Sequence, residues 1–271
     1  MKFGRGKDRL KPEDCGLVDM DEFPSWIIYE DENFLALNKP GWLVCHPSKN
    51  GPLSSLAGAA RVYLGTNSLH LVSRLDRETS GVVLIAKNAA AASRAQGALE
   101  SKREMVSKTY AAILCGNFDG TITISQPLSD DRASLVSSRV CCAIRKPSAK
   151  SAVSVFRSLS HSGDGGEPYT LAEVKILTGR KHQIRAHAHW AGYPVAGDKI
   201  YGPDETLYLD FAESGFTDEM GKILPIRRHA LHAYRYDFSR VIEGLSITAP
   251  LQSDMLEFMD KHKIINCFRN I

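Results

Sequence analysis

Residues 71–86 read Leu-Val-Ser-Arg-Leu-Asp-Arg-Glu-Thr-Ser-Gly-Val-Val-Leu-Ile-Ala, a charged loop followed at once by an apolar run. Asp76 stands between Arg74 and Arg77, and the run Val82–Ala86 predicts a buried strand. Neighbouring arginines favour the ionised form of a carboxyl group, whereas burial disfavours it. An acid held ionised at the start of a buried strand suits a nucleophile or a base. The alternative is a surface Arg-Asp-Arg turn whose exposed ion pairs add little stability.

A second charged segment, residues 177–187, reads Leu-Thr-Gly-Arg-Lys-His-Gln-Ile-Arg-Ala-His. It predicts the end of a strand and then a helix that begins at about Arg180–His182 and reaches Ala191. A helix N-terminus beside arginine and lysine favours anion binding. The i, i+3, i+7 spacing puts His182, Arg185 and His189 on one helix face, from which Arg185 is expected to reach a carboxylate of another segment.

The histidines of this helix, His182, His187 and His189, do not have the pattern of a metal site. They lack thiolates or carboxylates at ligand spacing, and a His-x-His pair on a helix diverges by about 200°. We therefore expect no metal here, and histidines that are structural or face RNA.

The rest of the chain predicts many short strands and few helices. The predicted strands are residues 26–29, 34–37, 82–86, 109–114, 121–124, 149–159, 169–177 and 228–238. The other predicted helices are residues 53–64, an alanine-rich helix from the Asn88 cap to about residue 102, and one around residues 255–259. Because several strands follow each other directly, we expect an α+β fold with a mixed, mostly antiparallel sheet.

Length and composition exclude several classes of protein. The 271 residues suffice for one large or two small domains, and 43% hydrophobic with 24% charged residues is ordinary for a globular chain. No apolar run approaches the roughly 18 residues of a membrane span. The six cysteines form no Cys-x-x-Cys pair, which favours a reducing compartment over a disulfide framework.

The net charge of +3 hides strong segregation of charge along the sequence. The segments 1–12 and 132–190 carry +4 and +7, whereas 13–32 and 203–223 carry −8 and −5. Such segregation indicates either one basic face for a polyanion or ordinary solvated faces of mixed sign.

The two charged segments around Asp76 and Arg185 resemble sequence elements of the RluA family of pseudouridine synthases. Residues 74–81 resemble its Arg-Leu-Asp-x-x-Thr-Ser-Gly element, and residues 177–187 resemble its later Thr-Gly-Arg-x-His-Gln-[Ile/Leu]-Arg-x-His element. Further matches lie at 38–41, 46–47, 108–110, 116 and 192–202, so the resemblance extends over about residues 25–250. Ser73 and Trp42 depart from the family pattern, which usually has histidine and glycine there.

The resemblance implies an isomerase that converts uridine in RNA to pseudouridine without cofactor or metal. It implies a pseudouridine synthase fold in two halves flanked by helices, with the active-site cleft between them. Asp76 would be the catalytic aspartate, Arg185 its ion-pair partner, and Tyr110 the tyrosine that stacks on the target base. Arg74 would fill the space of a flipped base or contact a phosphate. The other expected RNA contacts are Arg77, Arg180, Lys181 and His182.

The expected organisation is an extension at residues 1–24, a catalytic domain at 25–250, and a C-terminal helix and tail at 251–271. We expect a cytoplasmic monomer with a ribosomal or transfer RNA substrate and no membrane partner. One alternative function is an RNA-binding or RNA-folding protein with incidental or no catalysis. Another is a glycoside hydrolase, but that chemistry usually needs a second carboxylate, and the nearest, Glu78, is expected to point elsewhere.

Overall fold

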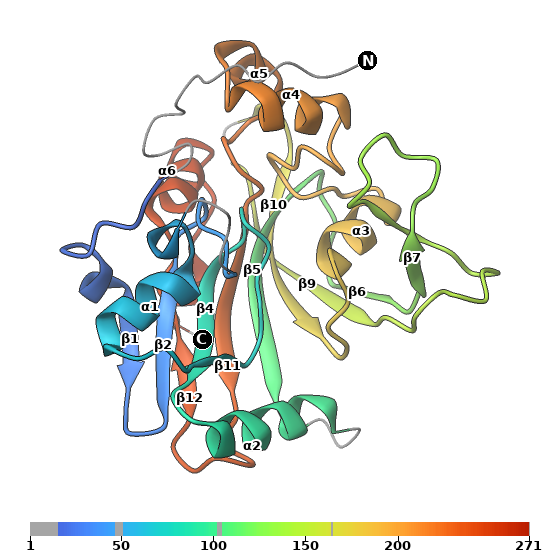
Figure 1. The fold of residues 1–271 in the computed structure, drawn as a ribbon. Coiled ribbons are helices and arrows are strands. Elements are labelled where there is room, and N and C mark those ends of the chain that lie inside the picture. The colour runs from blue at the N-terminus through green and yellow to red at the C-terminus, as the bar shows by residue number, and fades with distance from the viewer. Residues whose placement is uncertain (1–15, 47–50, 102–104, 164, 271) are drawn as a thin grey trace, which may run out of the picture.

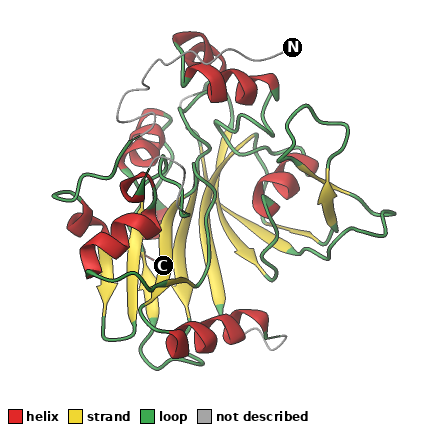
Figure 2. Cartoon of the chain, viewed as in Figure 1, coloured by secondary structure: helices red, strands yellow, loops and turns green. Residues whose placement is uncertain are grey.

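A single mixed sheet of ten strands organises the molecule (Figures 1 and 2). The computed structural model describes residues 16–46, 51–101, 105–163 and 165–270. Eight strands follow the order β1-β2-β4-β11-β5-β10-β9-β6, while β3 pairs with β4 and β12 with β11. All of these pairs are antiparallel except β11 with β4, which confirms the predicted α+β class with its mostly antiparallel sheet.

The first half of the sheet begins with a hairpin formed by the predicted strands at residues 26–29 and 34–37. Its strands are β1 (Ile27–Glu30), β2 (Phe34–Lys39), β3 (His70–Leu71) and β4 (Ser80–Ala86). Every residue of β4 is buried, and because alternate residues of a strand point to opposite sides, the strand is covered on both faces. Val83 and Ile85 pack in a core with helix α1 (Leu56–Leu64), whereas Val82 and Leu84 pack in the main core.

The second half contains β5 (Ser107–Cys115), β6 (Thr121–Ile124), β9 (Ser154–His161) and β10 (Tyr169–Ile176). β4 leads into helix α2 (Ala89–Glu100), which lies below the sheet in Figure 1. The side chain of Asn88 accepts the backbone N–H of Ala91, which confirms the predicted N-cap. The predicted end of this helix near residue 102 lies outside the described residues.

β11 (Leu231–Asp237) joins the two halves between β4 and β5. At its parallel contact with β4, Ala233 pairs with Gly81, whose φ is +107°. A Cβ atom at Gly81 would lie 2.3 Å from the Ala233 carbonyl oxygen. Only glycine fits here, because both the left-handed backbone and the close strand exclude a side chain.

The remaining helices surround the upper and right-hand parts of the sheet in Figure 1. They are α3 (Gln183–Trp190), α4 (Thr206–Ser214), α5 (Asp218–Ile223) and α6 (Ser253–Lys261), with 3₁₀ turns at Phe23–Trp26, Pro52–Ser54 and Cys267–Asn270. The short strands β7 (Leu128–Asp130) and β8 (Val140–Cys142) form a separate hairpin beside α3, and β12 is Ser246–Thr248. The sequence pattern did not predict α4, α5, β3, β7, β8 or β12.

The predicted terminal segments are partly integrated into the cores. Val18 and Phe23, from the predicted extension, are buried with α1, so residues 16–24 are not a free arm as far as the structure describes them. On α6, Met255 and Phe258 lie in the main core. No helix within the described ranges is long and apolar enough to cross a membrane.

Candidate active site

Asp76 lies in the loop between β3 and β4, and buried groups hold the backbone on both sides of it. The fully buried ammonium of Lys39 donates to the Arg77 carbonyl at 2.9 Å and to the carbonyls of Pro40 and Leu43. The Cys45 thiol lies 3.4 Å from the Leu75 nitrogen and 3.5 Å from the Leu75 oxygen. The loop is therefore fixed from beneath while the Asp76 side chain stays 31% exposed.

Arg185 on α3 connects Asp76 to a second carboxylate. Its Nη1 donates to Asp76 Oδ2 at 3.0 Å, while Nε and Nη2 donate to Asp198 Oδ2 and Oδ1 at 2.6 and 2.8 Å. Asp198 is fully buried, and its Oδ1 also accepts the backbone N–H groups of Ile200 and Tyr201. This bidentate pair fixes the guanidinium in the orientation that reaches Asp76. The predicted contact between Arg185 and a carboxylate of another segment is thus present in the structure.

The charges of this cluster favour ionised carboxylates. Burial acts to raise the pKa of Asp76, but His182, Arg185 and His229 outweigh it and lower the pKa below its ordinary value. Burial likewise opposes ionisation of Asp198, and Arg185 reverses the effect, so this pKa is also lowered. Asp76 is therefore a charged, partly exposed carboxylate in a site of otherwise buried groups.

His182 differs from its predicted position on the helix. It precedes α3 as the N-cap residue in the left-handed region (φ 51°, ψ 19°), so it does not share a regular helix face with Arg185 and His189. Its ring lies against Asp76, with Nε2 3.8 Å from Oδ2, and the side chain is only 10% exposed. The predicted helix start at about Arg180–His182 was one to three residues too early, since α3 begins at Gln183.

Tyr110 lies on β5 in the middle of the sheet. Its hydroxyl is 2.9 Å from that of Tyr236, and the residue is 6% exposed. Burial, followed by Tyr236 and Asp76, raises the pKa of Tyr110 well above its ordinary value. The phenol is thus neutral, and its stacking on a base stays a prediction.

The other predicted RNA contacts are exposed and lie on two separate loops. Arg74 and Arg77 flank Asp76, and Arg77 Nε donates to the Trp42 carbonyl at 3.1 Å. Arg180 and Lys181 precede α3, and Arg180 Nε donates to the Ser151 carbonyl at 2.9 Å. The contact between Arg185 and Asp76 brings these two loops to the same site.

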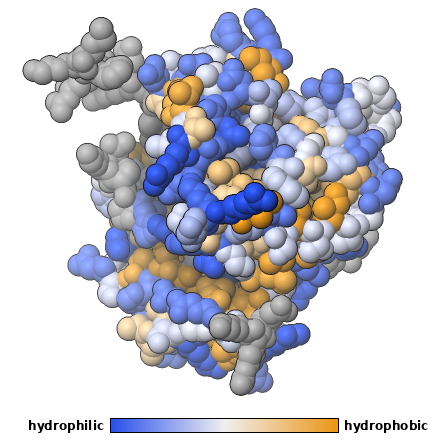
Figure 3. Space-filling view, turned by 90° about the vertical axis from the view of Figure 1, so that its right-hand side faces the viewer, coloured by the Kyte–Doolittle hydropathy of each residue, from blue (hydrophilic) through white to orange (hydrophobic). Residues whose placement is uncertain are grey.

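Part of the basic stretch 132–190 is neutralised within the molecule. Arg139 pairs with Glu205 at 2.5 Å and Asp131 at 3.5 Å, and Arg157 pairs with Glu173 at 3.2 Å. On the side of the molecule that carries β7 and α3, hydrophilic residues cover most of the upper part, and a continuous hydrophobic area lies in the lower part (Figure 3). Of these partners, Glu205 and Asp131 lie outside the stretch, so its net charge of +7, which already includes Glu173, overstates the charge available to a polyanion.

A second buried ionic cluster lies behind the Asp76 loop. Glu78 accepts from Lys199 Nζ at 2.6 Å and lies 3.5 Å from His229 Nδ1. Burial opposes ionisation of Glu78, but His229 and Lys199 lower its pKa to about 2. Glu78 is thus committed to a structural ion pair, in agreement with the prediction that it points away from Asp76's chemistry.

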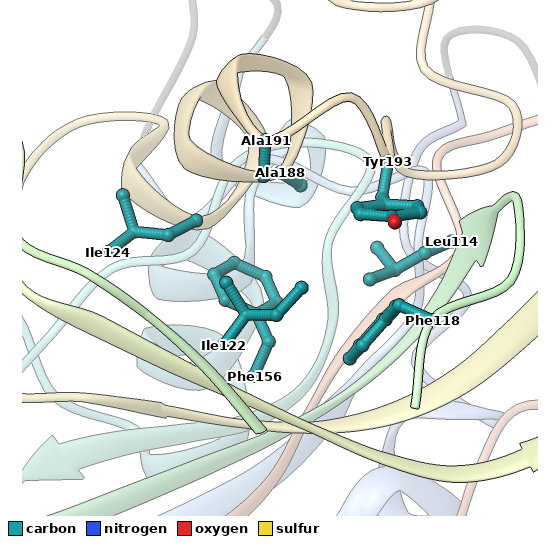
Figure 4. A pocket seen from close by; sticks show the side chains of 8 residues that line it. All are labelled: Leu114, Phe118, Ile122, Ile124, Phe156, Ala188, Ala191 and Tyr193. Carbon is teal, nitrogen blue, oxygen red and sulfur yellow. The ribbon is translucent and has the colours of Figure 1, made fainter. Parts of the chain in front are cut away.

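Two cavities lie outside the cluster of Asp76, His182 and Arg185, none of which lines either of them. A groove of about 650 Å³ runs beside the loop and includes Trp42, Arg77, Glu78 and Phe211 in its walls. An apolar cavity of about 10 Å³ lies between α3 and the sheet (Figure 4), which is room for one water at most. In the described ranges, no three His, Cys, Asp or Glu side chains are arranged to hold a metal ion.

Sequence reasoning missed the roles of Asp198 and Tyr201. Both lie in the 192–202 segment that carried part of the family resemblance, but no chemistry was assigned to them. The available signal was an aspartate, next to Lys199, in a loop that follows the segment of Arg185, and its pairing depends on the tertiary fold.

Comparisons with known proteins identify the family of this chain. Residues 33–190 match the RNA pseudouridylate synthase family model. An uncharacterized RNA pseudouridine synthase of Mycoplasma pneumoniae is 36% identical over 67% of this chain, which covers 56% of that relative's length. The ribosomal large subunit pseudouridine synthase D of Yersinia pestis is 30% identical over 89% of this chain and 72% of that protein. Human RNA pseudouridylate synthase domain containing 1 superposes with a TM-score of 0.65 at 26% identity, covering 83% of this chain and 82% of that structure.

The chain therefore belongs to the RNA pseudouridylate synthase family, a class of isomerases that convert uridine in RNA to pseudouridine. The family resemblance carried by the segments around Asp76 and Arg185 is confirmed.

Proposed function

We propose that this protein isomerises specific uridines of structured RNA to pseudouridine, with Asp76 as the catalytic carboxylate. The observation that carries the proposal is the state of the two Asp76 oxygens. Oδ2 is bound by Arg185 and faced by His182, whereas no hydrogen bond from the described part of the chain reaches Oδ1. A charged, oriented carboxylate with one uncommitted oxygen is what this reaction requires of the enzyme.

The reaction is an internal transfer of the base. The bond from uracil N1 to ribose C1′ breaks, C5 bonds to C1′, the C5 proton is lost, and N1 gains a proton. Attack of Asp76 on C1′, its addition to the uracil ring, and abstraction of a sugar proton all need the ionised carboxylate next to the nucleoside. The lowered pKa of Asp76 supports all three routes equally.

The RNA contacts form the second part of the proposal. A stacked uridine must be flipped out to reach Asp76, at a cost of a few kcal/mol of unstacking. Arg74 fills the space left by the base or contacts a phosphate, and Tyr110 stacks on the flipped uracil. Arg77, Arg180 and Lys181 contact the RNA backbone, since phosphate pairing provides most sequence-independent affinity.

The proposed substrate is ribosomal or transfer RNA. The Yersinia relative's name points to the large ribosomal subunit, and 30% identity leaves the particular uridine open. A cytoplasmic monomer completes the proposal.

Release of tritium from RNA labelled at uridine C5 tests the activity, since C5 loses its hydrogen in this reaction. Pseudouridine mapping of total RNA from cells with and without the gene then identifies the modified site. A folded protein that binds such RNA without releasing tritium from any transcript of the cell would instead be an RNA-binding or RNA-folding protein.

A further inference from the structure

His182 is held in a strained backbone conformation whose effect is to aim its ring at Asp76. Apart from glycines, it shares a positive φ only with Lys263 among the described residues. The left-handed backbone conformation is unfavourable for most residues other than glycine, and residues that adopt it tend to occur at functional sites. The Gln183 side chain stabilises this turn by accepting from the Arg180 N–H at 3.0 Å and the Thr178 hydroxyl at 2.8 Å.

The ring of His182 contacts a polar group at each nitrogen. Nδ1 lies 3.2 Å from the Tyr201 hydroxyl, and Nε2 lies 3.8 Å from Asp76 Oδ2. Burial, reinforced by Arg185, lowers the pKa of His182 to about 4, although Asp76 and Asp198 act in the opposite direction. At neutral pH the imidazole therefore carries one proton. The nitrogen that holds this proton determines whether Asp76 faces an N–H group or a lone pair.

The surroundings of Tyr201 select the position of that proton. The Tyr201 hydroxyl already accepts the backbone N–H of Val140 at 3.0 Å, and burial raises the pKa of this phenol, so it remains protonated. Within the described residues, His182 Nδ1 is the one acceptor near enough for the phenol proton. If Tyr201 donates to Nδ1, the imidazole proton must lie on Nε2, facing Asp76. The opposite tautomer would direct a lone pair at a carboxylate and leave the phenol proton without an acceptor.

We propose that His182 is a positioning residue for Asp76, set by Tyr201 in the tautomer whose Nε2–H faces Oδ2. Arg185 holds Oδ2 by a hydrogen bond and the Nε2–H of His182 faces the same oxygen at 3.8 Å, which leaves Oδ1 to the nucleoside. This inference rests on the proposed function of Asp76. It replaces the predicted contact of His182 with RNA by a contact with the catalytic carboxylate.

The kinetic test uses His182→Asn, because asparagine tolerates the left-handed conformation but is too short to keep both ring contacts. We expect kcat on an RNA substrate to fall about 10-fold, the lower end of the effect of a hydrogen bond to a charged group because the 3.8 Å separation is longer than such a bond, with KM within about twofold. His161→Asn, the same change at a histidine on β9 paired with Asp119, is the matched control and should leave both constants unchanged. A rise in KM at unchanged kcat would show that His182 contacts RNA and would overturn the proposal.

The structural test measures the tautomer directly in the intact protein. Nitrogen-15 shifts of labelled histidine rings, assigned by loss of the His182 signal in His182→Asn, should show the Nε2–H form. Tyr201→Phe should move His182 toward the Nδ1–H form, since the donor to Nδ1 is removed. A wild-type ring in the Nδ1–H form would refute the inference; if His182→Asn failed to fold, through-bond assignment of the wild-type ring would replace the assignment by variant. Isomerisation by Asp76→Asn would refute the function of Asp76 without altering the tautomer result, so the two failures are distinguishable.

Discussion

Replacement of Arg185 by methionine should destabilise the protein strongly because it leaves a carboxylate buried without its partner. The Arg185 side chain is 5% exposed and makes three hydrogen bonds to two carboxylates, one of which, Asp198, is fully buried. Removing one member of a buried ion pair costs about 3–5 kcal/mol, which is a large part of the stability of a typical domain. Urea unfolding at pH 7, followed by circular dichroism, would measure this loss.

The pH dependence of the same variant provides a second test. In the wild type, the pKa of Asp198 is lowered in the folded state, so its stabilisation is present above the unfolded value of ~3.9 and is lost as pH falls below it. Without Arg185, burial should raise the folded pKa above the unfolded value. The folded variant then binds more protons than the unfolded chain, so its stability should rise as pH falls from 7 toward 5.

Two controls separate this mechanism from general damage at the site. Arg180→Met, an exposed position five residues earlier, should change stability by less than about 0.5 kcal/mol. Adding Asp198→Asn to Arg185→Met should restore part of the stability, since the uncompensated charge is then removed. A loss below about 1 kcal/mol for Arg185→Met at pH 7, with no gain on acidification, would refute the buried-pair account.

Three further predictions concern packing, ionisation and RNA affinity. Gly81→Ala should lower the free energy of unfolding by about 3 kcal/mol or more, measured by thermal unfolding, because the new Cβ would collide with β11. Its control, Gly97→Ala, lies in open space on α2 and should raise the free energy of unfolding by about 0.5–1 kcal/mol. Equal effects of the two changes would contradict this account. The pKa of Glu78 is lowered to about 2 in the folded protein, so its ionised form stabilises the fold above the unfolded pKa of ~4.3, and this stabilisation is lost as the pH falls from there toward 2. Glu78→Gln should therefore be less stable than wild type at pH 6, and the difference in stability should disappear toward pH 2. A difference in urea midpoint that does not change with pH would argue against the ion pair. Lys181→Ala should reduce the slope of log affinity for RNA against log salt by about 0.7–0.9, and Arg157→Ala, which removes a cation already paired with a carboxylate, should reduce it less; similar reductions would count against a contact at Lys181.

Local patterns were sufficient to predict most of the sheet, and the family resemblance identified the central ion pair. The alternation of residue types along β10 and the short apolar run of β4 are both typical of strands. Asn88 marked the start of α2. The pairing of Arg185 with Asp76 followed from two sequence elements of one family, although 109 residues separate the two side chains.

Other features depend on contacts between distant segments and were not accessible from local sequence. Asp198 is adjacent in sequence to Lys199, but its partner in the structure is Arg185, on a helix that begins 15 residues before Asp198, whereas Lys199 pairs with Glu78. The short strands β7 and β8 have too few residues for a periodic signal. His182 was wrongly placed within the helix because the spacing of residues does not reveal that its backbone is left-handed, which puts it just before the helix.

The central claim is that Asp76 performs the chemistry while other residues bind the RNA. Its most direct test is Asp76→Asn, which keeps the size of the side chain and removes its charge, assayed for tritium release from C5-labelled uridine and for RNA affinity on the same transcript. We predict that isomerisation is abolished and that the dissociation constant for RNA changes by less than about threefold, since the phosphate contacts that dominate affinity lie elsewhere. Pseudouridine formation at a substantial rate by the folded Asp76→Asn protein would contradict the account.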